Sequence, residues 1–384
     1  MKINNRIHLC LAKMSPDGIE QRYIQEAFDT NWVAPLGPNV DAFEKDLEGF
    51  INATTSKHIA ALSSCTAAIH VALLLLGMKQ GDEVICQSFS FCASSNPVVY
   101  CGATPVFVDS DEETWNLSPE LLEEAIKDRI AKRGRKPKAI IVVDLYGMPA
   151  NWGAIEEVAH RYEIPVIEDA ANALGSTYQG KPCGTFGDLA TLSFNGNKII
   201  TTSGGGAIIC KDEATKKRAV FLATQAREPF PYYQHEVIGY NYRMSNICAG
   251  IGRGQMTVLA DHIAHHRHVH ALYSELFRDV EGVEVHGNPD GRFDSNFWLS
   301  TILLNPSAVK ADVLEICRCF DRAGIEARPL WKPMHKQPVY KDAPAYVNGV
   351  SEALFKVGMC LPSGPYVSDN DVRYIVEKIK EAII

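Results

Sequence analysis

The sequence lacks several features that would assign it to common classes of protein. Its formal net charge is −8, so it has no excess of the basic residues that bind nucleic acid. Its longest apolar run, residues 67–78, is too short to cross a bilayer and contains His70. Residues 1–5 lack the apolar stretch of a signal peptide. We therefore expect a protein that acts on a small molecule, without a nucleic-acid or membrane partner.

The cysteines also lack a recognisable arrangement. The chain has eleven, an odd number, with no C-x-x-C pair and no regular frame. Cys317 and Cys319 lie two residues apart, which is weak as metal spacing, so we interpret them as structural. Scattered, unpaired thiols are typical of a reducing compartment, and we predict a cytoplasmic protein without a metal site.

Short apolar segments alternate with helical patterns through most of the chain. Candidate strands lie at residues 59–62, 83–86, 104–108, 139–144, 165–169, 191–194 and 207–210. Candidate helices lie at residues 19–28, 40–50, 66–76, 119–127 and 152–162. This alternation predicts an α/β fold with a largely parallel sheet covered by helices. Ligands in such sheets bind at the carboxyl ends of the strands.

The length of 384 residues favours two domains. A long helical stretch follows Ser245 and could connect them. Beyond it lie strand-like runs at residues 298–304 and around Ile325, and a final helix at residues 371–383. We predict a large domain at residues 1–255 and a smaller C-terminal α/β domain at residues 256–384.

Two clusters of ionisable residues have a simple structural interpretation. The basic run at residues 127–138 precedes a buried strand, and we expect a solvated helix end and loop. His262, His266 and His270 recur every four residues on a predicted helix. Because no acidic or cysteine ligand is grouped beside them, we expect a solvent-facing stripe rather than a metal site.

Lys198 stands out because a strand, an Asn-Gly turn and a glycine-rich exit surround it in residues 193–206. A desolvated lysine has a lowered pKa and becomes a nucleophilic amine that condenses with an aldehyde. This is what pyridoxal phosphate requires of a protein. No G-x-G-x-x-G follows an early strand, which disfavours a nicotinamide-dependent enzyme.

Pyridoxal phosphate also needs a carboxylate for its ring nitrogen, a platform for its ring and an anion site for its phosphate. Asp169, at a strand end, is a candidate for the carboxylate, and Phe91 for the platform. Ser64, Cys65 and Thr66 lead into a helix whose N–H groups would bind phosphate. Ser193 is a further candidate donor.

Eight segments along nearly the whole chain carry a resemblance to a known family. They are NWVAPLG at 31–37, GDEVI at 81–85, IEDAA at 167–171, GTFGD at 184–188, SFNGNKIITT at 193–202, GYNYRMSN at 239–246, RPLWKPMH at 328–335 and LPSG at 361–364. The sequence resembles the DegT/DnrJ/EryC1/StrS family of nucleotide-sugar aminotransferases that depend on pyridoxal phosphate. The resemblance implies the aspartate aminotransferase type of fold and a homodimer with shared active sites.

The resemblance also implies individual roles. Lys198 would bond to the cofactor aldehyde and later move the proton between cofactor and sugar, Asp169 would pair with the ring nitrogen, and Phe91 would stack on the ring. Further cofactor contacts would come from Ser64, Cys65, Thr66, Asn172, Ser193 and, from the partner subunit, Asn241. The nucleotide-sugar would lie near Trp32, Pro35, Leu36, Gly37, Arg243, Arg328, Trp331 and His335. Many members have glycine at the position of Cys65, and glutamine or histidine at that of Asn172.

Residues 197–206 and 224–228 most resemble enzymes that aminate C4 of UDP-linked 4-keto-6-deoxy-N-acetylhexosamines for bacterial surface glycans. The implied substrates are UDP-2-acetamido-4-keto-2,6-dideoxyhexose and L-glutamate. Amination at C3 or of a GDP-4-keto-6-deoxy sugar, as in perosamine synthases, is an alternative. A non-catalytic regulatory protein with this fold is a more distant one. Sugar dehydratases of the family have histidine in place of the lysine, so Lys198 excludes them.

Overall fold

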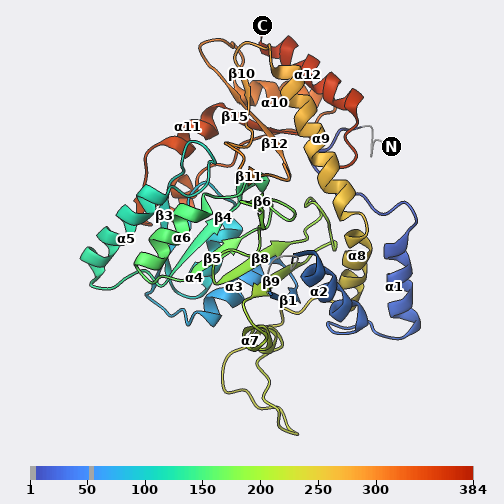
Figure 1. Ribbon diagram of the computed structural model, residues 1–384, viewed down its shortest axis with the longest axis vertical. Coiled ribbons are helices and arrows are strands. Elements are labelled where there is room, and N and C mark those ends of the chain that lie inside the picture. The colour runs from blue at the N-terminus through green and yellow to red at the C-terminus, as the bar shows by residue number, and fades with distance from the viewer. Residues whose placement is uncertain (1–5, 52–55, 384) are drawn as a thin grey trace.

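A large sheet forms the centre of the molecule (Figure 1). The structure is a computed structural model that describes residues 6–51 and 56–383, so residues 1–5, used above to judge a signal peptide, lie outside it. Eight strands of the described chain lie in the order β1-β9-β8-β5-β4-β2-β3-β14. They are β1 (His58–Leu62), β2 (Glu83–Gln87), β3 (Thr104–Val108), β4 (Ala139–Val143), β5 (Val166–Asp169), β8 (Leu189–Ser193), β9 (Gly206–Cys210) and β14 (Ala345–Tyr346).

All seven strands predicted from the sequence belong to this sheet. Pairing is parallel from β14 to β8, whereas β9 is antiparallel to both β8 and β1. The predicted, mostly parallel sheet is therefore confirmed. Its antiparallel edge was not predicted, because an apolar run does not reveal the direction of its strand.

Different helices cover the two faces of the sheet, because side chains alternate along each buried strand. On β4, Ile140 and Val142 share a core with α2, α5 and α6, whereas Ile141 shares a second core with α3, α4 and α7. The helices of this part are α1 (Ile19–Asp29), α2 (Pro38–Ile51), α3 (Cys65–Leu75), α4 (Asn96–Tyr100), α5 (Pro119–Arg133), α6 (Trp152–Arg161), α7 (Glu213–Ala223) and α8 (Asn246–Met256). Short 3-10 turns are η2 (Cys92–Ser94) and η3 (Leu145–Gly147).

The C-terminal third builds a second, antiparallel sheet in the order β10-β12-β15-β13. Its strands are β10 (Val283–Val285), β12 (Ser300–Leu304), β13 (Arg328–Pro329) and β15 (Gly358–Leu361). Its helices are α9 (Leu259–Phe277), α10 (Val313–Arg322), α11 (Val350–Val357) and α12 (Asp369–Ile383), with turns η4 (Met334–Lys336) and η5 (Pro338–Tyr340). A small third sheet contains β6 (Thr177–Tyr178), β7 (Lys181–Pro182) and β11 (Phe293–Asp294). The strand expected around Ile325 is only a single bridge to Ile7.

The helical stretch expected after Ser245 is two helices, α8 and α9, separated at Thr257 and Val258. We propose that the domain boundary lies here, near residue 255. The C-terminal third is nevertheless tied to the large sheet, because β14 pairs with β3. Within residues 6–51 and 56–383, no helix is both long and apolar enough to cross a membrane.

The prediction of a solvent-facing histidine stripe is wrong. His262, His266 and His270 are buried on α9, which packs against protein on the sides that carry them. His262 Nδ1 donates to the Ile199 carbonyl at 3.0 Å, and the His270 ring stacks on Phe297 at 3.5 Å. A neutral imidazole can be buried in this way. The spacing of the histidines in the sequence did not reveal that their side of the helix is buried.

The interpretation of the basic run at residues 127–138 is also partly wrong. Lys127, Lys132 and Arg133 are exposed, as expected. Arg129 is buried and donates from Nε to Glu83 Oε2 at 3.0 Å. A buried guanidinium needs such a partner, and Glu83 at the start of β2 provides it.

The buried histidines predict a loss of stability in mild acid. Burial lowers the pKa of His266 to about 3 and that of His270 to about 4. Below the ordinary value of 6.5 the unfolded chain therefore binds protons that the folded chain does not. The free energy of unfolding should fall by on the order of 4 kcal/mol between pH 7.5 and pH 5 from these two residues. Urea titrations across this range measure it.

A matched pair of variants tests the assignment. His266→Phe should reduce the fall in unfolding free energy between pH 7.5 and pH 5 by about 2 kcal/mol, because a phenyl ring cannot be protonated. His160→Phe, at an exposed position of α6, should leave it unchanged. Equal pH dependence in the His266 variant and the unaltered protein would contradict the explanation.

Candidate active site

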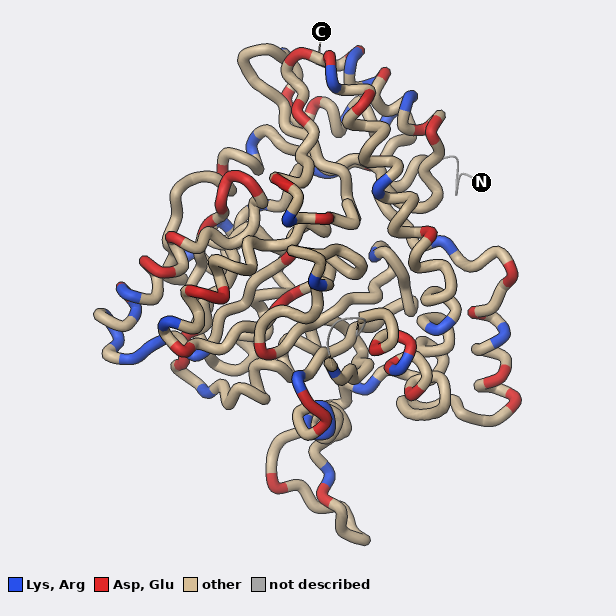
Figure 2. Tube along the Cα trace, in the orientation of Figure 1, with Lys and Arg blue, Asp and Glu red and all other residues tan. Residues whose placement is uncertain are grey.

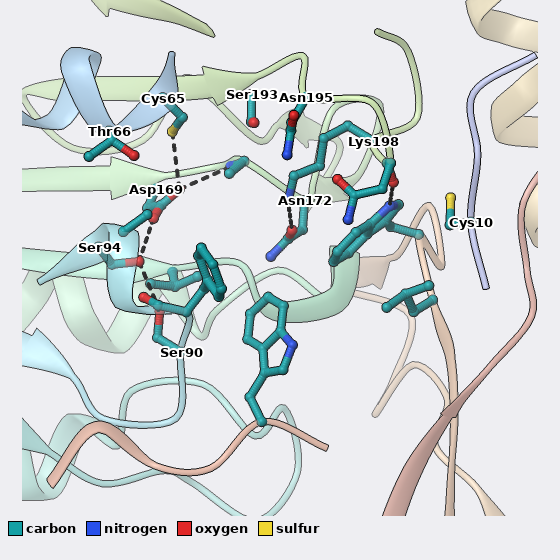
Figure 3. A pocket seen from close by; sticks show the side chains of 18 of the residues that line it. Cys10, Cys65, Thr66, Ser90, Ser94, Asp169, Asn172, Ser193, Asn195 and Lys198 are labelled. Atoms are coloured by element: carbon teal, nitrogen blue, oxygen red, sulfur yellow. Dashed lines mark hydrogen bonds between the residues drawn. The ribbon is translucent and has the colours of Figure 1, made fainter. Parts of the chain in front are cut away.

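A cavity of about 880 Å³ lies beyond the carboxyl ends of β2, β5 and β8 and is closed by residues of the second sheet. Figure 3 shows side chains that line it. The predicted residues that line it are Ser64, Cys65, Thr66, Phe91, Asp169, Asn172, Ser193, Lys198, Arg328 and Trp331. The fold thus gathers residues that are far apart in the sequence into one site.

The N-terminus of α3 forms one end of the cavity. Ser64 is the N-cap, and its side chain accepts a hydrogen bond from the Ala67 N–H at 3.0 Å. The first N–H groups of a helix have no intrahelical acceptor and carry a partial positive charge. With the Thr66 hydroxyl beside them and Ser193 at the end of β8, they suit a phosphate group.

Gly206 explains part of the glycine-rich tail that follows Lys198. It begins β9 opposite Leu62 on β1, where the two backbones run close together. A Cβ atom at Gly206 would lie 2.3 Å from the Cys65 backbone nitrogen and 2.4 Å from the Ser64 carbonyl carbon. Only glycine lets β9 pass here without displacing the start of α3.

Gly206→Ala should therefore weaken cofactor binding. The added methyl group must push the Ser64–Cys65 backbone away, and overpacking of this kind costs about 1–3 kcal/mol. We expect the Kd for pyridoxal phosphate, measured by absorbance titration, to rise by about tenfold or more. Gly204→Ala is the control, since Gly204 lines the same cavity and a Cβ there meets no atom within 4 Å. Equal affinity in both variants would contradict this role.

Asp169 ends β5 with its carboxyl group in the cavity wall. Its oxygens accept hydrogen bonds from Ser94 Oγ at 2.6 Å and the Ala171 N–H at 3.1 Å, and Cys65 Sγ lies 3.7 Å away. Burial raises its pKa, and the Ser94 hydrogen bond opposes that rise by favouring the carboxylate. Ser94 is itself held by Ser90 Oγ at 2.8 Å. The site therefore fixes the orientation of one buried carboxyl group.

Lys198 enters from the loop after β8, and Figure 3 shows its amine joined to Asn172. Its Nζ donates to Asn172 Oδ1 at 2.6 Å and lies 4.1 Å from the centre of the Trp298 ring. Desolvation lowers the pKa of the amine to about 8, against the opposing charge of Asp169. A substantial neutral fraction near pH 7 to 8 makes this amine a nucleophile and a proton acceptor.

Two aromatic rings and two cations form the outer wall. The Phe91 side chain is exposed to the cavity, and its ring centre lies 5.6 Å from that of Trp331. Arg328 and Lys332 lie on either side of Trp331 in the sequence and line the same wall. Arg328 pairs with Glu326 at 3.1 Å and still exposes most of its guanidinium side chain.

Seven predicted residues do not reach the cavity of their own chain: Trp32, Pro35, Leu36, Gly37, Asn241, Arg243 and His335. Arg243 is turned away because its Nη1 donates to Glu44 at 2.6 Å and to the Ala61 carbonyl at 2.7 Å. His335 is turned away by Ser88 Oγ, 2.6 Å from its Nδ1, and by Glu352.

The segment 32–37 is fastened to the start of α8, where Asn246 Nδ2 donates to the Trp32 carbonyl at 3.0 Å and Asn246 N–H donates to Ala34. The Trp32 and Leu36 side chains are exposed there, as is Asn241 in the segment before α8. Trp32, Leu36 and Asn241 therefore lie on the surface rather than in the cavity.

The structure adds site residues that the sequence analysis did not select. They are Cys10, Ser90, Ser94, Asn195, Trp298, Glu326 and Lys332. Ser94 lies three residues after Phe91, which was a usable signal. Cys10 and Trp298 come from opposite ends of the chain, and nothing local in the sequence links them to Lys198.

Comparison with known proteins agrees with this geometry. The model of the DegT/DnrJ/EryC1/StrS aminotransferase family matches residues 16–380. The chain belongs to this family. It is 46% identical over 380 residues to EpsN of Bacillus subtilis (strain 168), named as a candidate pyridoxal phosphate-dependent aminotransferase, with 98% of this chain and 95% of EpsN covered. It is 37% identical over 364 residues to a GDP-perosamine synthase of Escherichia coli O157:H7, with 95% of each chain covered.

The fold comparison gives the same result. A DegT DnrJ EryC1 StrS aminotransferase from Brucella abortus superposes with a TM-score of 0.88 at 28% identity, covering 96% of each chain. The aspartate aminotransferase type of fold is therefore confirmed. As a member of the DegT/DnrJ/EryC1/StrS family, the protein is a pyridoxal phosphate-dependent sugar aminotransferase of the nucleotide-sugar type.

The residues of the cavity fit this cofactor. The cavity combines a lysine amine of lowered pKa, a buried carboxyl group, an exposed phenyl ring and the N-terminus of α3. The close passage at Gly206 leaves room for the Ser64–Cys65 backbone at the edge of the cavity, which both residues line. Each requirement of pyridoxal phosphate thus has a residue of matching chemistry.

Proposed function

We propose that this enzyme transfers the amino group of L-glutamate to C4 of UDP-2-acetamido-4-keto-2,6-dideoxyhexose, in the synthesis of a bacterial surface glycan. The observation that carries the aminotransferase assignment is that Lys198 and Asp169 share one cavity with the N-terminus of α3. The choice of sugar rests on residues 197–206 and 224–228, which resemble enzymes of that specificity.

The proposed roles follow from the position of each residue. Bound pyridoxal phosphate supplies an aldehyde and an electron-accepting ring. Ser64, Thr66, Ser193 and the first N–H groups of α3 hold its phosphate. The carboxylate of Asp169, kept in place by Ser94, stabilises a proton on the ring nitrogen.

Lys198 moves the reacting proton. With a pKa of about 8, its Nζ would accept a proton from the donor carbon and return it to the cofactor carbon in the first half of the reaction. In the second half the same nitrogen would move a proton from the cofactor carbon to the sugar carbon. Phe91 lines the same cavity and would cover one face of the ring, with Lys198 on the other.

The outer wall suits a nucleotide diphosphate. A guanidinium makes paired hydrogen bonds with phosphate oxygens, and Arg328 presents one at the rim beside Lys332. Trp331 lines the same wall and offers an indole face for the base or the sugar. Glutamate carries two carboxylates that the same cations would attract.

We further propose a homodimer in which the partner completes the site. After α7, residues 225–240 project from the body of the molecule (Figure 1), and Figure 2 shows that the tip of this loop is free of charged residues. The exposed apolar side chains on this loop are Phe230, Tyr232, Tyr233, Val237 and Ile238. Exposed apolar patches of this kind mark protein interfaces.

Pairing of two copies would also give a role to the segments that do not reach their own cavity. Trp32, Leu36 and Asn241 are exposed, and in a symmetric dimer such a surface faces the other subunit. Light scattering that finds only a monomer in the active enzyme would contradict this proposal. A cytoplasmic location is supported by the eleven free thiols.

A GDP-linked 4-keto-6-deoxy sugar is the second candidate substrate. It is favoured by three relatives named GDP-perosamine synthase, which are 33% to 37% identical over about the whole chain. Amination at C3 is a third possibility in the same site, since the position of the keto group depends on how the sugar ring is seated.

A panel of keto-sugars decides among these substrates. Purified enzyme with L-glutamate is offered UDP-, GDP- and dTDP-linked 4-keto-6-deoxy sugars and a 3-keto sugar, and products are identified by NMR. We expect the highest kcat/KM for the UDP-linked N-acetyl sugar, with nitrogen at C4. A higher kcat/KM for the GDP sugar would replace the first candidate with the second, and nitrogen at C3 would contradict both.

A further inference from the structure

Trp298 makes a contact with Lys198 that the proposed roles do not use. The Lys198 Nζ lies 4.1 Å from the centre of the indole ring and 2.6 Å from Asn172 Oδ1. An ammonium over the face of a tryptophan is attracted by the negative face of the ring, more strongly where water is excluded. The two contacts therefore favour the same state of the lysine, in which its amine is free and protonated.

The position of Trp298 is fixed by its surroundings rather than by Lys198. The side chain is 2% exposed, and its Nε1 donates to the Asn197 carbonyl at 2.7 Å. Its backbone N–H donates to Asn296 Oδ1 at 2.8 Å, while Asn296 Nδ2 donates to the Asn172 carbonyl at 2.9 Å. One fully buried asparagine thus ties both partners of the lysine amine together.

The preceding residue supports this arrangement. Phe297 has a positive φ of 49°, which is uncommon for a bulky residue, and its ring stacks on His270 at 3.5 Å. This turn lies just before β12 and places Trp298 in the cavity wall. Strain of this kind persists where the surrounding packing imposes it, and it is frequent at functional sites.

We infer that Trp298 and Asn172 form a resting site that holds the Lys198 amine whenever it is not bonded to the cofactor. The inference rests on the proposed role of Lys198. In each half of the reaction that amine is released, takes up a proton, delivers it and must later return. A resting site keeps the protonated amine beside the cofactor between taking up the proton and delivering it. Trp298 thereby becomes a further residue that contacts a reacting atom.

The resting site has a thermodynamic consequence that binding can measure. Lys198 loses its free amine when Nζ bonds to the aldehyde carbon of pyridoxal phosphate with release of water. It keeps the free amine when pyridoxamine phosphate is bound. Contacts that stabilise only the free amine must weaken the binding of pyridoxal phosphate and leave that of pyridoxamine phosphate unchanged.

The test compares Trp298→Leu with Trp298→Phe in cofactor-free protein. Both variants lose the hydrogen bond to Asn197, but only phenylalanine keeps an aromatic face under the amine. Relative to the Phe variant, the Leu variant should bind pyridoxal phosphate about tenfold more tightly at pH 7, with equal Kd for pyridoxamine phosphate. The pH at which Lys198 bonds to the aldehyde, followed by absorbance, should fall by up to about one unit.

Trp331→Leu is the control, because it removes a neighbouring indole, 6.2 Å from Trp298, that packs on Phe91 rather than on Nζ. It should leave the ratio of the two Kd values unchanged. Equal ratios in the Leu and Phe variants of Trp298 would overturn the inference and leave the role of Lys198 intact. Failure of the unaltered protein to bond pyridoxal phosphate at Lys198 would overturn both. If Trp298→Leu does not fold, Trp298→Met carries the same comparison.

Discussion

Replacing Lys198 by alanine is expected to lower kcat by on the order of 10⁴-fold, the upper range for a positioned general base. The methyl group of alanine can neither bond to the cofactor aldehyde nor move a proton, so both halves of the reaction should stop. Steady-state assays with glutamate measure the overall loss. Single-turnover absorbance with glutamate alone isolates the first half.

The control for this variant is Lys217→Ala. Lys217 is exposed on α7 and pairs with Glu213 outside the cavity, so its loss should leave kcat and KM unchanged. Cofactor should still enter the Lys198→Ala protein, because the start of α3 and Asp169 remain. Turnover within tenfold of the unaltered enzyme would remove Lys198 from the mechanism.

Asp169→Asn is expected to reduce kcat by about 10²- to 10³-fold, the usual effect of removing one preorganised electrostatic partner. The amide keeps the size of the side chain and can still accept from Ser94, but it has no charge to stabilise a proton on the ring nitrogen. Cofactor occupancy should change much less, because the phosphate is held elsewhere. Absorbance titration and kcat are therefore measured on the same preparation.

A second aspartate tests whether this effect is local. Asp321 is exposed on α10, pairs with Arg6 at 2.8 Å and does not line the cavity. Asp321→Asn should have unchanged kcat. If Asp169→Asn lost cofactor and activity in equal proportion, Asp169 would be a binding residue only.

The large sheet could be predicted from the sequence because its strands are continuous apolar runs between turn signals. Buried parallel strands leave that pattern whatever their neighbours are. The second sheet was predicted much less well, because β10 and β13 have only three and two residues, too few for a period to emerge. The direction of β9 could not be predicted from the sequence either, since strand direction depends on the path of the connecting chain.

The site residues likewise fall into those that the sequence predicts and those that it does not. Lys198, Asp169 and the start of α3 could be found because each carries chemistry in a local pattern. Trp298 could not, because its role arises from a contact with Lys198 that the fold creates. Ser94 was overlooked although it lies three residues after Phe91, and its contact with Asp169 confirms that signal. Arg243 shows what a residue type leaves open: a guanidinium suits a diphosphate, but within this chain it pairs with Glu44 on α2 and does not line the cavity.

The histidines of α9 show why spacing alone misleads. An interval of four residues places side chains on one face of a helix but does not say whether that face meets water or protein. Here that face meets protein. The Ile199 carbonyl accepts from His262, and the ring of Phe297 stacks on His270. Only the packing of α9 against Ile199 and Phe297 reveals that these histidines are buried.

The most direct test of the account is to identify the lysine that holds the cofactor. Borohydride reduction of the purified protein loaded with pyridoxal phosphate fixes the cofactor on that lysine, and peptide mass spectrometry locates it. The account predicts one modified position, Lys198, in the segment SFNGNKIITT. Modification of a different lysine, or of none, would contradict it.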